Sequence, residues 1–171
     1  MHPTYRKALI AMAGAISITV GAARAASAQA TSAAKANPAK PQGAPKLKWG
    51  PAPAMLPRGA KMAVVSGDPS KSGPFEVQLS MPGGYRIPPH FHPTDETVAV
   101  KSGTFRYGMG DKVETAKMQT MKAGQSGTMQ ANMHHYATAR GKTVISISST
   151  GPFATTYVNP ADDPTKAAPK K

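Results

Sequence analysis

Alternating apolar and polar positions run through the middle of the chain and predict short β-strands rather than helices. The clearest run, 75–81, places Phe75, Val77, Leu79 and Met81 on one face. The other predicted strands are 62–66, 97–101, 104–109, 128–130, 135–139, 143–148 and 153–158. Glycine, proline and serine separate them at a spacing typical of an antiparallel sandwich or closed barrel. No helix of ordinary length is expected.

The two ends of the chain show different patterns. Arg6 and Lys7 precede an uncharged apolar run, 8–23, and small residues around Ala28 follow. This order is typical of a secretory signal peptide, and it predicts residues 1–28 as the signal, with export to a periplasm or to the medium. A retained membrane anchor is disfavoured because the run is shorter than the roughly 20 residues that span a bilayer.

Between the signal peptide and the strands, residues 29–46 are mostly Ala, Pro, Lys, Ser and Gln and cannot bury enough apolar area to fold. We therefore expect a disordered linker at 29–46 and, by the same argument, a disordered tail at 161–171. A single folded domain is predicted over 47–160.

The net charge of +13 changes this picture little once it is mapped along the chain. Residues 47–160 hold 12 Lys and Arg against 6 Asp and Glu, and the rest of the surplus lies in the flanks. The basic residues of the domain are scattered in sequence without interleaved aromatics, so nucleic acid is not expected as a partner. The chain has no cysteine, which excludes disulfides, thiolate metal sites and a cysteine nucleophile.

Histidines gather in two short segments. His90, His92 and Glu96 fall within seven residues, and on an extended strand His90 and His92 point to the same face. A further ligand from a neighbouring strand would be His134 or His135, because only one of two adjacent strand residues can face inward. Such a set suits one divalent transition metal: Fe, Mn, Ni, Cu or Zn. The alternative is a structural His-x-His pair at the surface.

The stretch Gly84-x5-His90-x-His92-x3-Glu96-x6-Gly103 resembles the first motif of the cupin superfamily at every defined position. A degenerate second motif begins at Gly124. Asn132 stands there where glycine is usual, which is tolerable because asparagine accepts a positive φ angle, and His135 stands at the histidine. The other departures are Gln130 in place of proline and Ala139 in place of asparagine.

This resemblance implies an all-β fold, a double-stranded β-helix or jelly-roll barrel of antiparallel strands. It also implies metal ligation by His90, His92, Glu96 and His135, and it is compatible with a homodimer. Four further residues are candidates for substrate binding, with packing at the rim as the alternative: Tyr85, Arg86, Tyr107 and His134.

Two functions remain open at this point. The first is an exported metal-dependent enzyme acting on a small organic molecule, a dioxygenase-like oxidoreductase, a decarboxylase-type lyase or an isomerase. The second is a cupin that binds or senses such a molecule without converting it. Neither the metal nor the substrate follows from the residues, because one ligand set serves several ions and many reactions.

Overall fold

The computed structural model describes residues 46–166, which form an all-β domain of antiparallel strands. The strands are β1 (Gly50–Pro51), β2 (Lys61–Ser66), β3 (Gly73–Met81), β4 (Arg86–Phe91), β5 (Glu96–Ser102), β6 (Thr104–Met109), β7 (Gln119–Lys122), β8 (Ser126–Met129), β9 (His135–Ala139), β10 (Thr143–Gly151) and β11 (Thr156–Tyr157). Two short 3-10 helices, η1 (Thr115–Lys117) and η2 (Pro160–Asp162), complete it. Within this part of the chain, no helix is long and apolar enough to cross a membrane.

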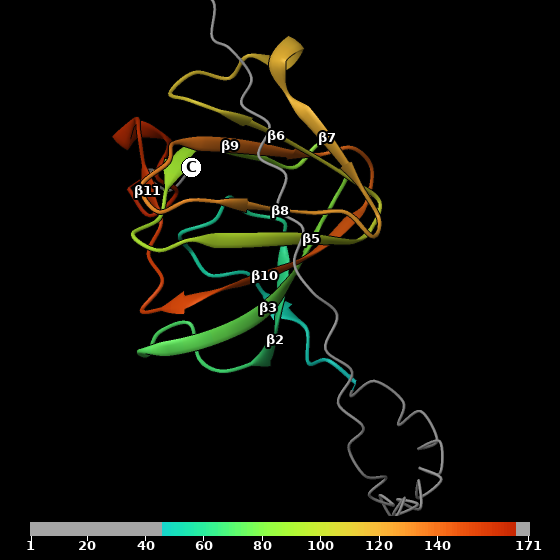
Figure 1. The fold of residues 1–171 in the computed structure, drawn as a ribbon, viewed down its shortest axis with the longest axis vertical. Coiled ribbons are helices and arrows are strands. Elements are labelled where there is room, and N and C mark those ends of the chain that lie inside the picture. Colours follow the sequence, from blue (N-terminus) through green and yellow to red (C-terminus); the bar gives the residue numbers. More distant parts are fainter. Residues whose placement is uncertain (1–45, 167–171) are drawn as a thin grey trace, which may run out of the picture. The chain divides into compact units, whose positions relative to one another are not determined.

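The strands form two sheets, with the order β1-β2-β3-β10-β5-β8 in one and β11-β4-β9-β6-β7 in the other (Figure 1). From β3 to β6 each successive strand lies in the opposite sheet, and β8 to β11 alternate in the same way. This alternation is the connectivity of a double-stranded β-helix, and it confirms the predicted all-β antiparallel fold. The expected closure into a barrel is wrong, because no strand of one sheet pairs with a strand of the other among the described residues.

The core lies between the two sheets and follows from the period-two pattern. On β3, Phe75, Val77, Leu79 and Met81 are buried while the residues between them are more exposed. β10 pairs with β3 along its whole length and contributes Ile145 and Ile147 to the same core. Burying one such side chain contributes about 1.5–3 kcal/mol, so the alternation alone specifies which face turns inward.

Most predicted strands are present within a few residues of their expected bounds. Strands β1 and β7 were not anticipated, and β4 was expected only as an extended segment around His90 and His92. Strand β11 is much shorter than the predicted 153–158. Asn132 has the positive φ angle that the sequence predicted, 62°, and its backbone N–H donates to the carbonyl of His92. This bond fixes the turn before β9 beside the first histidine segment.

The flanks are described only in part. The predicted signal peptide, 1–28, and all of the predicted linker except residue 46 lie outside the described residues. At the other end, residues 160–162 form η2, and the side chain of Asn159 accepts a hydrogen bond from the N–H of Ala161. The first residues of the predicted tail, as far as residue 166, therefore belong to the described part of the chain and include a capped turn of 3-10 helix.

Candidate metal centre

Three histidines from two adjoining strands meet on the inner face of the five-stranded sheet. His90 on β4 lies directly opposite His135 on β9, with ring centroids 4.3 Å apart. His92 follows just beyond the end of β4, and its ring centroid lies 5.0 Å from that of His90 and 5.2 Å from that of His135. All three side chains are buried, and one ligating nitrogen from each lies within 4.8 Å of the other two.

The outer nitrogen of each ring is held by the backbone. Nδ1 of His90, His92 and His135 lies 2.7, 2.8 and 2.9 Å from the carbonyl oxygens of Pro88, Ala154 and Met133. A carbonyl oxygen can only accept, so each Nδ1 carries the proton and donates it. In the neutral ring the lone pair then belongs to Nε2, which is the arrangement that orients histidine as a metal ligand.

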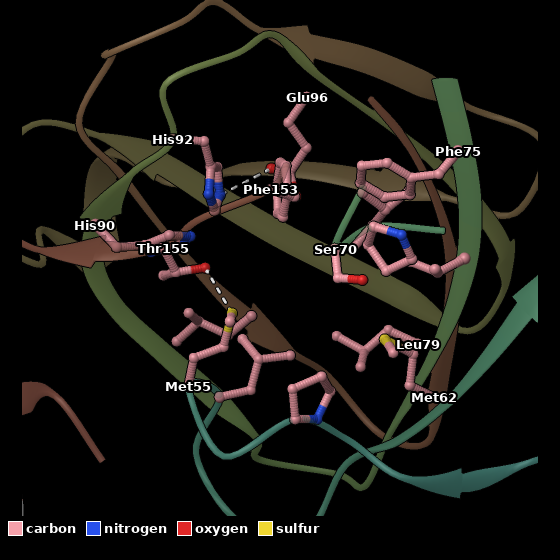
Figure 2. A pocket seen from close by; sticks show the side chains of 16 residues that line it. Met55, Met62, Ser70, Phe75, Leu79, His90, His92, Glu96, Phe153 and Thr155 are labelled. Atoms are coloured by element: carbon pink, nitrogen blue, oxygen red, sulfur yellow. Dashed lines mark hydrogen bonds and ion pairs between the residues drawn. The ribbon is translucent and has the colours of Figure 1, made fainter. Parts of the chain in front are cut away.

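Glu96 reaches the histidines from the opposite sheet. It is the first residue of β5, is buried, and places Oε2 3.4 Å from Nε2 of His135 and 3.7 Å from Nε2 of His92, and Figure 2 shows the contact with His92. Nε2 of His92 and Nε2 of His135 are buried without a hydrogen-bond partner among the described residues. Unpartnered buried nitrogens are costly. Three imidazole lone pairs beside one carboxylate therefore fit a divalent cation.

Burial keeps two of the imidazoles neutral. Desolvation, with the neighbouring His135 and His92, lowers the pKa of His90 to about 3, and desolvation also lowers the pKa of His92. For Glu96, burial alone would raise the pKa, but the contacts with His135 and His92 outweigh it, so the pKa is lowered. Burial disfavours the charged form of His135 too, but the contact with Glu96 outweighs burial and raises the pKa of His135. The carboxylate is thus ionised beside two neutral imidazoles, those of His90 and His92, while its charge favours a proton on His135 that a metal bound at Nε2 would displace.

A cavity of about 280 Å³ adjoins the histidines, between the two sheets. His90, His92 and Glu96 form one part of its wall, and apolar side chains such as Leu79, Ile147 and the two methionines Met55 and Met62 form most of the rest (Figure 2). In the part of the chain that the structure describes, the only other side chains of the wall with a polar group are Ser70 and Thr155. Among the described residues no Lys, Arg or Tyr lines it.

Phe153 supports both the cavity and the histidine cluster. Its ring stacks on His92 with centroids 4.3 Å apart and meets Phe75 edge-on at 5.3 Å. Its backbone N–H donates to the carbonyl of Pro69, which ties the segment after β10 to the loop before β3. In the sequence Phe153 is simply the first residue of the predicted strand 153–158, and its place against a histidine follows only from the tertiary structure.

The residues that close the cavity were not predicted. Met55 belongs to the segment before β2, where its carbonyl accepts from the hydroxyl of Tyr157 and its sulfur from the hydroxyl of Thr155, at 2.7 and 3.6 Å. Ser70 stands in the loop before β3 and donates to Asp68. These positions belong to no recognisable sequence motif. The fold brings them together from segments up to about a hundred residues apart in the chain.

The four predicted substrate-binding residues lie away from this cavity. Tyr85 is buried and donates its hydroxyl to the carbonyl of Pro57. Tyr107 packs against the core and donates to Gln119 Oε1 at 2.8 Å. Arg86 lies on the outer side of its sheet and lines a different cavity.

His134, the fourth of these residues, is also the alternative to His135 as a ligand. It contacts Asp111 Oδ1 at 2.6 Å and stacks on Phe91, with ring centroids 4.9 Å apart. The structure therefore brings His135, and not His134, to His90, His92 and Glu96.

Comparisons with known proteins agree with this geometry. A family model described as "Cupin domain" matches residues 77–149, a segment that holds all four of these side chains. No functionally curated protein matches the chain in sequence.

Among solved structures, a candidate acetylacetone dioxygenase from Methylibium petroleiphilum is similar, with 22% identity, a TM-score of 0.53, and coverage of 69% of this chain and 79% of its own. The polyketide cyclase RemF from Streptomyces resistomycificus has 13% identity and a TM-score of 0.52, covering 61% of this chain and 75% of its own. At these identities the likeness concerns the fold alone. With the family match, the sheet connectivity and the clustered histidines in place, the chain belongs to the cupin superfamily.

Proposed function

We propose that this protein binds one divalent transition metal through Nε2 of His90, His92 and His135 and the carboxylate of Glu96, and that it acts on a small organic molecule in the adjoining cavity. The observation that supports this most is the commitment of all three Nδ1 atoms to backbone carbonyls. It leaves two Nε2 atoms buried without a partner beside a buried carboxylate.

The donor set restricts the metal to a class. Three imidazoles and one carboxylate, without sulfur, suit Fe, Mn, Ni, Cu or Zn in the divalent state. When bound, such an ion supplies a Lewis acid or an oxygen-binding centre with positions left for small ligands. The protein contributes fixed ligands, because each ring is oriented by a backbone acceptor and His92 also by the face of Phe153.

The cavity favours a neutral, largely apolar substrate that presents oxygen toward the histidines. A divalent cation and the Glu96 carboxylate together leave one positive charge, and no basic side chain of the described residues lines the cavity. A dianion would therefore lie in an apolar wall without full compensation, which is costly. The Thr155 hydroxyl, which donates only to the weak acceptor Met55 Sδ, is available for a substrate oxygen.

One observation favours the second candidate function, binding without conversion. Apart from the proposed ligands, no side chain in the cavity wall can act as an acid or a base near neutral pH. If the protein is an enzyme, the metal and Glu96 would have to carry out every proton transfer at this site.

Among enzymatic reactions, a metal-dependent oxygenation therefore fits this wall better than a reaction that needs a separate general acid.

The proposal is tested by metal analysis of protein folded in the compartment where it works. We expect one equivalent of transition metal per chain in the wild type, and loss of retention in His90→Ala and His135→Ala. His134→Ala is the matched control, because His134 lies outside the cluster, and it should retain the metal. A metal-free wild type, or equal loss in His134→Ala and His135→Ala, would contradict the proposal.

Turnover separates the two functions. Metal-loaded protein is incubated aerobically with small phenols and diketones, and product formation is followed by mass spectrometry. Conversion that is lost in His90→Ala supports the enzyme, whereas saturable binding with unchanged ligand supports the sensor.

We also propose export with cleavage after Ala28, so the mature protein should begin at Gln29 in an intact-mass measurement.

A further inference from the structure

The outer face of the five-stranded sheet carries a second cavity, of about 600 Å³, on the side away from the histidines. β9 separates the two sites: His135 turns inward, and Thr138, three positions on, turns outward into the second cavity. What binds here therefore does not depend on the metal centre.

Three arginines from three parts of the sheet line this second cavity. Arg86 on β4 and Arg106 on β6 both pair in register with Thr138 of β9, which lies between them. Since neighbouring strands are about 4.8 Å apart, the two arginine backbones are about 10 Å apart. Arg140 follows Thr138 by two residues at the end of β9 and also lines the cavity. Long flexible side chains at these positions can meet over one bound group.

The positive charge of this face is not balanced by the protein. Within residues 46–166, Asp162 is the only acidic residue that lines the cavity. None of the three arginines forms an ion pair with a carboxylate of residues 46–166, and the guanidinium of Arg106 donates instead to the carbonyl of Thr115 at 2.9 Å. Like charges gathered around one cavity repel each other. A bound anion would relieve that repulsion.

Apart from Thr115, Thr138 and Asp162, the remaining side chains of the wall are mostly apolar, and one aromatic residue holds this part in place. Tyr136 is buried, and its ring lies over Gly108, where even a methyl group would clash. The Tyr136 hydroxyl accepts the backbone N–H of Glu114 at 2.9 Å, which fastens the β6–β7 connection over the sheet. This connection contributes Met118 and Val113, and Val113 is 54% exposed beside the arginines.

We propose that this second cavity binds a small anionic organic molecule, with a phosphate or carboxylate group on Arg86, Arg106 and Arg140 and an apolar portion against Val113 and Met118. Guanidinium groups recognise both anions through paired hydrogen bonds. A second copy of this chain is a poor occupant, because the chain has a net charge of +13 and only 8 acidic residues. The volume suits a small molecule.

Phenyl phosphate is the probe, because it joins an anion to an apolar ring. It is titrated into the full chain by calorimetry, next to inorganic phosphate and benzyl alcohol. We expect one saturable site that binds phenyl phosphate at least about tenfold more tightly than either half alone. Arg86→Gln and Arg140→Gln, both at exposed positions that leave the core intact, should each weaken binding by about tenfold.

Arg58→Gln removes an equal charge from an exposed position elsewhere and should bind as the wild type does. His90→Ala should also leave the affinity unchanged, since the metal centre faces the other way. Absence of saturation, or wild-type affinity in both arginine variants, would overturn the proposal. Equal weakening of binding by Arg58→Gln would also overturn the proposal, because the effect would then reflect the net charge of the protein and not a defined site.

Discussion

His90 and His135 lie directly opposite each other on neighbouring strands, with ring centroids 4.3 Å apart, although 45 positions separate them in the chain. This cross-strand pairing makes one site from two sequence segments, and Glu96 joins it from the facing sheet. The site therefore depends on the register of β4 with β9 and on the packing of the two sheets against each other. A shift of one residue in either strand would turn its histidine outward.

Glu96→Gln should weaken metal binding while preserving the fold. The amide is almost the same size as the carboxylate, but it removes the one negative charge beside the three imidazoles. We expect the metal dissociation constant to rise by at least about tenfold, equivalent to about 1.4 kcal/mol. The measurement is competition with a metal indicator. Asp95→Asn is the adjacent control, since Asp95 is exposed and accepts from Ala131 N, as an amide oxygen also can.

The cavity should select ligands by charge. 4-Methylcatechol and oxalate both offer two oxygens at similar spacing, but only the first is uncharged at neutral pH and carries an apolar body. We expect metal-loaded protein to bind 4-methylcatechol at least about tenfold more tightly than oxalate, because no basic side chain from residues 46–166 lines the cavity. Tighter binding of oxalate would refute the inferred substrate class while leaving the metal site intact.

Filling the cavity should abolish this binding without loss of metal. Ile147→Phe adds volume to a side chain of the cavity wall, whereas Ser148→Phe adds the same ring on the exposed side of β10. The first variant is expected to lose 4-methylcatechol binding and the second to keep it, both with one equivalent of metal. Calorimetry with parallel metal analysis measures the two quantities, and equal affinity in both variants would contradict the assignment of the cavity.

Metal-free protein should lose stability as the pH falls from 7 to 5. The pKa of His90 is about 3 in the folded protein and about 6.5 when unfolded, so only the unfolded state gains a proton in this range. The contribution of His90 to the free energy of unfolding is fully present above pH 6.5 and decreases as the pH falls, by up to about 2 kcal/mol at pH 5. His92, whose pKa is also lowered, acts in the same direction.

His135 opposes this trend, because its raised pKa contributes stability below pH 6.5 that is lost as the pH rises through its folded value. Urea unfolding with a chelator at several pH values measures the balance, and His90→Gln should flatten the dependence. A free energy of unfolding that increases from pH 7 to pH 5 would contradict this account of the buried imidazoles.

Two glycines with similar backbone angles should respond differently to alanine. Gly103 and Gly124 have φ angles of 81° and 87°, so each substitution costs about 1 kcal/mol for the left-handed conformation. A Cβ at Gly103 would also clash with the carbonyl oxygen of Lys142, whereas no atom of the described residues lies within 4 Å of a Cβ at Gly124. We expect thermal denaturation to show a clearly larger loss for Gly103→Ala. Equal losses would mean that the turn between β5 and β6 relaxes freely.

The sequence predicted most of the strands and the four clustered side chains because both depend on local spacing. The period-two pattern of 75–81 needs only one buried face, and the two histidine motifs preserve their register within short segments. The choice of His135 over His134 followed in the same way from motif spacing, since adjacent strand residues face opposite sides.

The ligand cavity could not be predicted in that way. Met55, Ser70 and Thr155 meet through tertiary packing and carry no spacing signal. Tyr85 and Tyr107 were plausible candidates from their chemistry, but their hydroxyls are taken up by Pro57 and Gln119. Arg86 and Arg106 look scattered in sequence, yet both lie opposite Thr138 on the sheet.

A crystal structure of metal-loaded protein, with anomalous scattering recorded above and below the absorption edge of the metal, tests the central claim most directly. We predict one anomalous peak among Nε2 of His90, His92 and His135, within bonding distance of Glu96. A protein loaded to one equivalent whose peak lies at His134 and Asp111, or anywhere else outside the cluster, would contradict it.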